Sequence, residues 1–386
     1  MMKAIRNGIL IVPDETGHFC SREGLTLLYD EKIRAIRPEG KDAGHADLEE
    51  VYDAGGAYVA PGFLNVHIHG CDGADTMDAD SDALDKMSLF QARTGVTAYL
   101  PTTMTCAFSD IAHALCTIRH AMHGDAHGAR VLGCHMEGPF IAPSKKGAQD
   151  AAHILPADFS TIEPYADVIK IITVAPETLP DDAFIKACTA HGIVVSIGHT
   201  AADYETAAHA IEAGAHHITH LCNAMTGLHH RRPGVLGAAL DSTANCELIC
   251  DNVHLHPTMQ RIIYHAKGGK HLILITDSLR ACGLGDGPSE LGGQKVTVRG
   301  TLATLADGTI AGSVLCLNDG LRIFRTNTGA PIPSIIEMVT RTPAKELGLY
   351  DEIGSLSEGK TADFAIFDRD FRMRRTVVGG TTYYKK

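Results

Sequence analysis

The chain lacks any apolar run close to the roughly eighteen residues of a membrane-spanning helix, and its N-terminal apolar segment is too short for a signal peptide. Positive charge is also scarce, because 34 Lys and Arg stand against 46 Asp and Glu, a net charge of −12. Such a chain is not expected to bind nucleic acid or an anionic membrane. Its 11 cysteines form no CxxC pair, so neither a zinc ribbon nor a disulfide framework is expected. These absences predict a cytoplasmic protein with reduced thiols.

Several nucleotide and nucleophile motifs are missing as well. The sequence has no GxGxxG after a strand-like run, no GxxxxGK[ST] and no GxSxG, so it offers no dinucleotide, P-loop or serine-hydrolase signature. Histidine, in contrast, is abundant, with 22 residues. Several of them directly follow apolar runs, and this placement indicates a site more strongly than the number does.

Short apolar runs alternate with helical segments from about residue 59 to residue 353. Eight strand–helix units of this scale predict an α/β fold of the (β/α)8, TIM-barrel type. Residues 1–58 and 354–386 have the pattern of short strands and turns, without helical periodicity. We therefore expect both chain ends to pair into one small β domain beside a barrel of residues 59–353.

Polar residues close most of the barrel runs: His67, His69, Glu137, His199, His220, His254 and Asp277. The active sites of such barrels lie at the C-terminal ends of the strands, where these side chains would meet. Imidazole and carboxylate groups are ligands of divalent metals. The pattern predicts a metal centre assembled from several strand ends.

Each of these features has a structural alternative. His67 and His69 share one strand face, a spacing suited to one ion, but such pairs are structural about as often. Glu137 could bind or bridge a metal, or it could pair with an arginine. A lone histidine such as His199 or His220 is more often a core residue. Two of them on successive strands, after a carboxylate, favour ligation.

Three further features of the sequence also bear on the site. Asp277 could take a proton from the attacking water beside a metal, or it could cap a helix N-terminus. His135 and Glu137 stand at alternate positions in GCHMEGPF, so a strand would place them on one face. Arg231 and Arg232 form a basic cluster whose guanidinium groups suit a phosphate, although two solvated arginines are the simpler interpretation.

The motifs HMEGPF, SIGHT, THLCNAM, ITDS and TIAGS, in this order, resemble those of the N-acetylglucosamine-6-phosphate deacetylase family of the amidohydrolase superfamily. PGFLNVHIHG, KKGAQD and EGKTADFAIFD fit as well, so the resemblance covers essentially the whole chain. It implies a (β/α)8 barrel with a small β-sandwich made from both chain ends. The activity it implies is hydrolysis of the acetamide of N-acetyl-D-glucosamine 6-phosphate to D-glucosamine 6-phosphate and acetate. It also implies a homodimer.

The resemblance further assigns roles to residues. Glu137, His199 and His220 match the primary ligands of a divalent metal (zinc, iron, cobalt or manganese), and Asp277 matches the catalytic acid and base. The substrate contacts that it implies are Ala148, Gln149, Asn223, Ala224, Arg231, His254, Ile310, Ala311, Gly312 and Ser313. Among these, Arg231 and His254 match the phosphate-binding pair.

The chain departs from some family members at one place. Those members have Gln-x-Asn where this chain has His67 and His69, bind one metal, and place a His where this chain has Gln149. The extra imidazoles and the missing His predict a second metal, so that one or two ions bind per chain. Residues 281–300 match no motif and are expected to form a mobile loop.

Other functions stay open at this point. A deacetylase of a related N-acetylhexosamine phosphate, such as N-acetylgalactosamine 6-phosphate, would carry the same motifs. A cyclic-amide hydrolase would be expected to have a bridging Lys, which is not found here. A non-catalytic barrel that serves as a scaffold would have no reason to keep every ligand and the acid/base.

Overall fold

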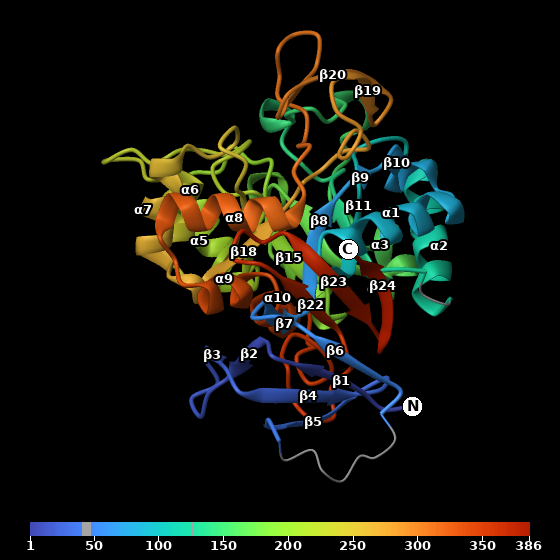
Figure 1. Ribbon diagram of the computed structural model, residues 1–386. Coiled ribbons are helices and arrows are strands. Elements are labelled where there is room, and N and C mark those ends of the chain that lie inside the picture. Colours follow the sequence, from blue (N-terminus) through green and yellow to red (C-terminus); the bar gives the residue numbers. More distant parts are fainter. Residues whose placement is uncertain (41–47, 125–126) are drawn as a thin grey trace.

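The computed structural model describes residues 1–40, 48–124 and 127–386 as a barrel with a smaller β domain beneath it (Figure 1). The parallel barrel strands are β8 (Phe63–Ile68), β11 (Val96–Thr103), β13 (Cys134–Glu137), β14 (Ile169–Val174), β15 (Val194–Ile197), β16 (His217–Ile218), β17 (Asn245–Ile249) and β18 (Leu272–Ile275), with β12 (Arg130–Val131) beside β11. The ring closes where the N–H of Asp277 donates to the carbonyl of His67 at 3.0 Å. The predicted barrel is confirmed.

A helix follows each barrel strand: α1 (Ser81–Arg93), α2 (Phe108–His123), α3 (Phe159–Ile162), α4 (Ala183–Ala190), α5 (Tyr204–Ala213), α6 (Gly234–Leu240), α7 (Pro257–Lys267) and α8 (Leu317–Thr328). In α2 the buried residues Ile111, Ala114, Leu115 and Ile118 recur at helical spacing, which turns one apolar stripe toward the barrel. The strands are buried on both faces, which explains their continuous apolar runs. None of the helices in the described residues is long and apolar enough to cross a membrane.

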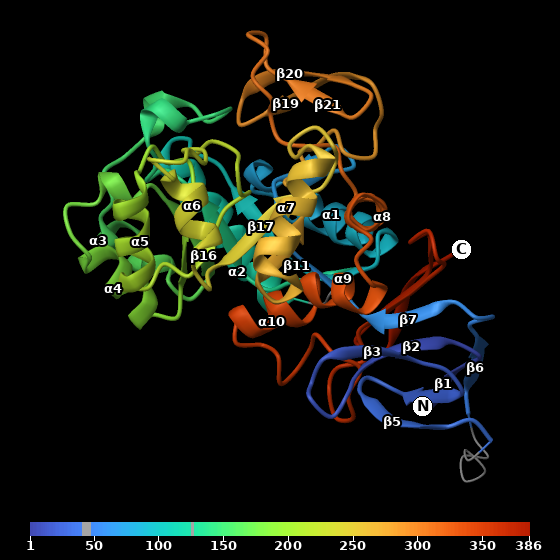
Figure 2. The ribbon, with the colours of Figure 1, turned by 90° about the vertical axis from the view of Figure 1, so that its left-hand side faces the viewer.

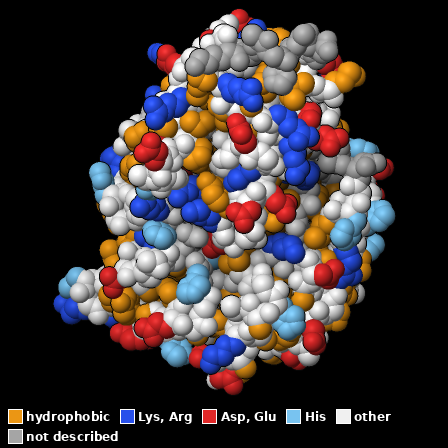
Figure 3. Space-filling model, turned by 90° about the horizontal axis from the view of Figure 1, so that it is seen from below, with side chains coloured by type: hydrophobic (Ala, Val, Ile, Leu, Met, Phe, Trp, Pro, Cys, Tyr) orange, Lys and Arg blue, Asp and Glu red, His pale blue; other side chains and the backbone are white. Residues whose placement is uncertain are grey.

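Two more helices, α9 (Ile332–Met338) and α10 (Arg341–Glu346), lie at the end of the barrel next to the small domain (Figure 2). The short 3-10 helices are η1 (Thr76–Asp78), η2 (Pro143–Lys145), η3 (Ala151–His153), η4 (Glu163–Tyr165), η5 (Pro176–Thr178) and η6 (Gly269–His271). Seen from below, acidic and basic side chains are intermixed on the surface (Figure 3).

The small domain is a sandwich of two sheets. One sheet has the order β5 (Ile33–Pro38), β4 (Leu25–Tyr29), β1 (Lys3–Arg6), β6 (Glu50–Asp53). The other has the order β24 (Thr381–Lys385), β23 (Met373–Val378), β22 (Phe364–Phe367), β7 (Tyr58–Pro61), β2 (Ile9–Pro13), β3 (Phe19–Arg22). Ile5 of the first sheet and Phe364 of the second lie in one hydrophobic core. The prediction that both chain ends build one β domain is confirmed. Its limits at 1–58 and 354–386 stay a prediction; β7 begins at Tyr58 and extends to Pro61, beyond the first limit.

The segment predicted to be a mobile loop is folded, so that prediction was wrong. Residues 281–300 contain β19 (Gly287–Leu291) and β20 (Gln294–Arg299), which pair with β21 (Leu302–Thr304) in an antiparallel sheet above the barrel (Figures 1 and 2). Gly292 and Gly293 connect β19 to β20 with φ of 54° and 79°, the left-handed conformation that a tight hairpin turn requires. A second hairpin, β9 (Gly70–Cys71) with β10 (Ala74–Asp75), follows the first barrel strand.

An ion pair between Arg130 and Asp363 joins the barrel to the small domain. Arg130 Nη1 donates to Asp363 Oδ1 at 3.1 Å, and its Nη2 contacts Oδ2. The N–H of Gly379 also donates to Asp363 Oδ1, at 2.8 Å. Burial raises the pKa of Asp363, and the Arg130 charge opposes that effect.

We predict that Arg130→Ala lowers the free energy of unfolding by about 3–5 kcal/mol, because it leaves a buried carboxylate without its cation. Arg119→Ala is the matched control, since it breaks a more exposed pair with Asp167 and should cost about 0–1 kcal/mol. Urea unfolding followed by circular dichroism measures both variants. Equal, small losses would show that the backbone contact from Gly379 is enough to hold Asp363.

Candidate metal centre and active site

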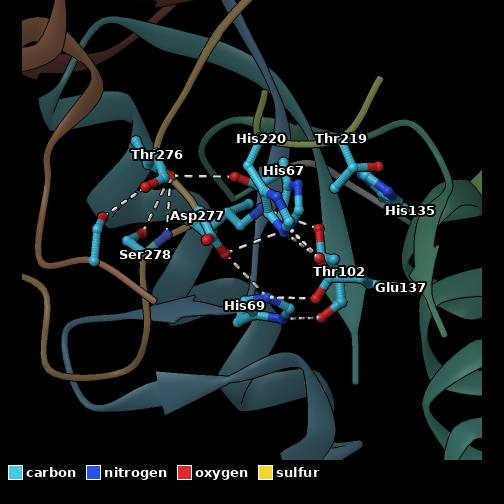
Figure 4. Close-up of polar contacts among 12 residues, drawn as sticks. His67, His69, Thr102, His135, Glu137, Thr219, His220, Thr276, Asp277 and Ser278 are labelled. Carbon is cyan, nitrogen blue, oxygen red and sulfur yellow. Dashed lines mark hydrogen bonds and ion pairs between the residues drawn. The ribbon is translucent and has the colours of Figure 1, made fainter. Parts of the chain in front are cut away.

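The predicted ligands converge at the C-terminal ends of the barrel strands, where His67 and His69 point toward Glu137 and Asp277 (Figure 4). Glu137 is the last residue of β13. His199, His220 and Asp277 each lie two residues beyond a strand, with φ of 48°, 26° and 49°. Positive φ is unfavourable for residues with a Cβ, and such strain is typical of functional sites. These turns direct the side chains inward.

The first candidate metal group consists of Glu137, His199 and His220. Glu137 Oε1 lies 3.2 Å from His199 Nε2 and 3.1 Å from His220 Nε2, and the two nitrogens are 3.1 Å apart. Ligand atoms at about 2.0–2.1 Å from a tetrahedral ion are separated by about 3.3 Å. The three atoms therefore have the spacing of one face of a metal coordination shell.

The hydrogen bond that fixes the tautomer of His199 supports this interpretation. Its Nδ1–H donates to the carbonyl oxygen of Lys145 at 2.9 Å. In the neutral imidazole the Nε2 lone pair then points at Glu137, an arrangement that is repulsive unless a cation or a proton lies between them. The residues present thus fit a divalent ion.

The second candidate group consists of His67, His69 and Asp277. Asp277 Oδ1 lies 3.4 Å from His67 Nε2 and 3.2 Å from His69 Nε2. The same two nitrogens are each 3.4 Å from an oxygen of Glu137, Oε1 for His67 and Oε2 for His69. Glu137 therefore faces both groups, and His67 Nε2 is buried without a hydrogen-bond partner in the described part of the chain. A second ion fits these atoms.

The charges in the site depend on one another. Burial raises the pKa of Glu137, but the imidazoles of His199 and His67 hold it well below its usual value. Burial likewise raises the pKa of Asp277, and His67 and His69 lower it further than burial raises it. Both carboxylates are thus ionised near neutral pH and require positive charge beside them.

His135 does not join these groups, although it shares a strand with Glu137. Its Nδ1–H donates to the carbonyl of Val66 at 3.0 Å, and its Nε2 pairs with Thr173 Oγ1 at 2.8 Å. Burial lowers the pKa of His135 to about 3. The residue is a neutral part of the polar network inside the barrel.

A cavity of about 340 Å³ opens onto the two groups. The predicted substrate contacts that line it are Ala148, Gln149, Asn223, Ala224, His254, Ile310 and Gly312. Gln149 Nε2 donates to Glu137 Oε2 at 2.6 Å, and Gln149 Oε1 accepts from the N–H of Thr105 at 2.7 Å. His254 Nδ1–H donates to Asp251 at 2.7 Å, which orients its ring at the cavity wall.

Three predicted contacts lie elsewhere in the single chain. Ala311 and Ser313 are buried and do not line the cavity: the N–H of Ala311 donates to the carbonyl of Ala303 at 3.0 Å, and the Ser313 hydroxyl donates to the carbonyl of Thr276. Arg231 lies on an exposed loop, with its Nη1 at 2.8 Å from His230 Nε2. The loop borders a separate hollow, so Arg231 does not line the cavity of its own chain.

Two features of the site were not predicted from the sequence. Glu247 lies inside the barrel, 2.9 Å from His67 Nδ1; the signal was a carboxylate within the otherwise apolar run of β17. Leu291, from the β19–β20 hairpin, lines the cavity together with Met104. The signal for this hairpin was the Gly292–Gly293 pair between two alternating segments.

The comparisons with known proteins agree with this geometry. The amidohydrolase family model matches residues 58–383. The N-acetylglucosamine-6-phosphate deacetylase of Bacillus subtilis (strain 168) is 40% identical over 367 residues, 93% of this chain and 92% of the relative. The chain belongs to the N-acetylglucosamine-6-phosphate deacetylase family of amidohydrolases.

Other members of the deacetylase family match as well. The N-acetylgalactosamine-6-phosphate deacetylase of Escherichia coli O157:H7 is 34% identical over 91% of this chain and 92% of its own. The structure of the Pasteurella multocida N-acetylglucosamine-6-phosphate deacetylase has a TM-score of 0.93 at 30% identity and covers 99% of both chains. A mutant of the Mycobacterium smegmatis deacetylase, in complex with N-acetyl-D-glucosamine-6-phosphate, has a TM-score of 0.90 at 26% identity and covers 100% of this chain and 99% of its own.

The second ion group of this family member can be tested directly. We predict that metal-free protein takes up two divalent ions per chain, and that His67→Ala/His69→Ala takes up one, because two of its nitrogen ligands are gone. Calorimetric titration with Zn²⁺ measures the steps. His120→Ala/His123→Ala, which removes two exposed histidines of α2, is the control. A single step that is unchanged in the His67/His69 variant would make these histidines structural.

Proposed function

We propose that this enzyme hydrolyses the acetamide bond of N-acetyl-D-glucosamine 6-phosphate to D-glucosamine 6-phosphate and acetate. The observation that carries the proposal is the position of Asp277, whose carboxylate lines the cavity 3.4 Å from His67 Nε2 and 3.2 Å from His69 Nε2. The cavity also contains polar groups that suit a sugar phosphate, among them Asn223 and His254. The names of the relatives support this substrate.

The roles of the residues follow from their charges and positions. A divalent ion (zinc, iron, cobalt or manganese) held by Glu137, His199 and His220 would polarise the acetamide carbonyl and make water more acidic. Asp277, whose pKa is lowered, is ready to accept the proton of the attacking water and to return it to the leaving amine nitrogen. His67 and His69 would hold the second ion.

Gln149 and Asn223 have supporting roles in this proposal. Gln149 donates to Glu137 Oε2 and thereby limits how that carboxylate can rotate. Asn223 Nδ2 donates to the carbonyls of His220 and Leu221, at 3.2 and 3.3 Å, which fixes its amide at the cavity wall. Ala148, Ala224, Ile310 and Gly312 would enclose the sugar, with Ala311 and Ser313 supporting the wall from behind.

We also propose that the protein is a homodimer in which the partner subunit's Arg231 completes the phosphate site. Arg231 is exposed on a projecting loop, and Leu228 on the same loop is exposed as well, so both side chains are accessible to a second copy of the chain. His254 lies at the cavity wall and would be the phosphate ligand within the chain. The eleven cysteines are free thiols, which fits the cytoplasmic location we propose.

The competing substrate is the epimer N-acetylgalactosamine 6-phosphate, for which one relative is named. Release of acetate from a panel of phosphorylated and unphosphorylated N-acetylhexosamines tests the proposal. The highest kcat/KM is expected for N-acetylglucosamine 6-phosphate. A preference for the galactosamine epimer would establish the alternative, and no release from any amide would make the barrel a scaffold.

We predict that Asp277→Asn lowers kcat by about 10²–10⁴-fold, because an amide cannot accept the proton of the attacking water. The metal content of the same preparation is the control, since a variant that lost its metal would be inactive for another reason. A kcat near that of the unmodified enzyme, with metal in place, would show that Asp277 is not the acid and base.

We predict that Arg231→Ala lowers kcat/KM for the phosphorylated substrate about ten- to a hundredfold. The reason is that a charge-assisted hydrogen bond worth ~1.5–3 kcal/mol is lost. The unphosphorylated sugar should be affected much less. Arg232→Ala is the matched control on the same loop. Equal losses on both sugars would give Arg231 a structural role.

Mixed dimers then test whether Arg231 acts across subunits. Arg231→Ala and Asp277→Asn proteins are each impaired, but after subunit exchange one site in the mixed dimer has an intact Asp277 and the partner's Arg231. Activity toward the phosphorylated substrate should therefore rise on mixing. No rise, with exchange verified by mass spectrometry, would place Arg231 in the site of its own chain or outside any site.

A further inference from the structure

Glu247 is fully buried inside the barrel, where one of its oxygens contacts both candidate metal groups. Glu247 Oε2 accepts the Nδ1–H of His67 at 2.9 Å and the backbone N–H of His220 at 3.0 Å. His67 belongs to the group with Asp277, and His220 belongs to the group with Glu137. A single carboxylate oxygen is thus shared between the two groups.

The contact with His67 determines which ring nitrogen is available. An ionised carboxylate only accepts, so Nδ1 of His67 must carry a proton, and Nε2 in the neutral ring presents its lone pair to Glu137 and Asp277. The ring is held within a closely packed interior, with its centroid 4.5 Å from that of His135. The hydrogen bond to Glu247 therefore fixes the tautomer of His67, and together with the packing it fixes the orientation of the ring.

The contact with His220 acts on the backbone. His220 has a φ of 26°, a value that residues with a Cβ rarely adopt. The hydrogen bond from its N–H to Glu247 stabilises this turn, and the turn brings His220 Nε2 to 3.1 Å from Glu137 Oε1. Strain at such a position persists only where surrounding contacts impose it.

The second oxygen of Glu247 takes part in a series of ion pairs that runs away from the candidate metal groups. Glu247 Oε1 lies 3.0 Å from His217 Nε2, and His217 Nδ1–H donates to Glu346 of α10 at 2.8 Å. All three side chains are buried. His217 thus lies between two carboxylates and links Glu247 of β17 to Glu346 of α10, which restrains the Glu247 side chain inside the barrel.

We propose that Glu247 is a positioning residue that holds His67 and His220 ready to bind metal, one in each ion group. This inference rests on the proposed metal centre. Histidine ligands of metals typically donate their other N–H to a carboxylate, and loss of that partner typically lowers metal affinity or activity 10–100-fold. A purely structural role would make Glu247 and Glu346 equivalent, since both pair with His217 in the core.

Titration of metal-free protein with Co²⁺ alone, followed by calorimetry and visible absorption, distinguishes the two roles. In Glu247→Ala, the binding step that His67→Ala/His69→Ala abolishes should weaken about 10–100-fold. Glu247→Gln should restore part of that affinity, because its amide oxygen can still accept both N–H groups. Glu346→Ala, the matched control, should leave both steps within a few-fold of the unmodified protein.

Thermal unfolding of the metal-free variants separates metal binding from folding. If Glu247→Ala does not fold, Glu247→Gln must still weaken the His67-dependent step relative to Glu346→Gln, because an amide is a weaker acceptor than a carboxylate. The inference would be overturned if both binding steps were unaltered in the Glu247 variants. It would also be overturned if the Glu247 and Glu346 variants lost metal affinity equally. Either result would leave the metal centre itself intact. A single step in the unmodified protein would overturn both the inference and the second ion group.

Discussion

Two buried carboxylates, Glu137 and Asp277, can coexist at the ends of the barrel strands only because imidazole nitrogens surround them at 3.1–3.4 Å. Burying one charge is costly, and burying a second charge of the same sign beside it adds repulsion in a medium of low dielectric constant. Positive charge between the carboxylates and the imidazoles removes that cost. A divalent ion would supply this charge without protonating Asp277, whose carboxylate could then accept a proton from water.

The rest of the barrel serves this arrangement. Parallel strands bring residues that are far apart in the sequence to one rim, and the positive-φ turns at His199, His220 and Asp277 direct their side chains inward. Backbone carbonyls fix the imidazole rings by accepting hydrogen bonds from Nδ1: the carbonyl of Lys145 accepts from His199, and that of Thr102 accepts from His69. The β19–β20 hairpin adds the apolar side chain of Leu291 to the cavity lining.

The barrel, the two-ended β domain and the convergence of Glu137, His199, His220, His67 and His69 could be predicted, because strand-end placement in a parallel barrel is a direct consequence of sequence order. Side-chain positions that depend on packing could not be predicted in this way. His135 has the same strand-face parity as Glu137, yet its hydrogen bonds to Val66 and Thr173 keep it in the interior. His217 is a buried ion-pair partner that the sequence pattern does not reveal, because its two acidic neighbours come from β17 and α10.

The central claim is that the carboxylate and imidazole groups at the strand ends form a metal centre. X-ray diffraction from crystals soaked in Zn²⁺, recorded on both sides of the zinc absorption edge, tests it most directly. We expect an anomalous peak about 2.0–2.2 Å from an oxygen of Glu137 and the Nε2 atoms of His199 and His220, with a second peak about 3.5–4 Å away beside His67 and His69. No peak at Glu137, with its oxygens still in direct contact with the imidazoles, would contradict it.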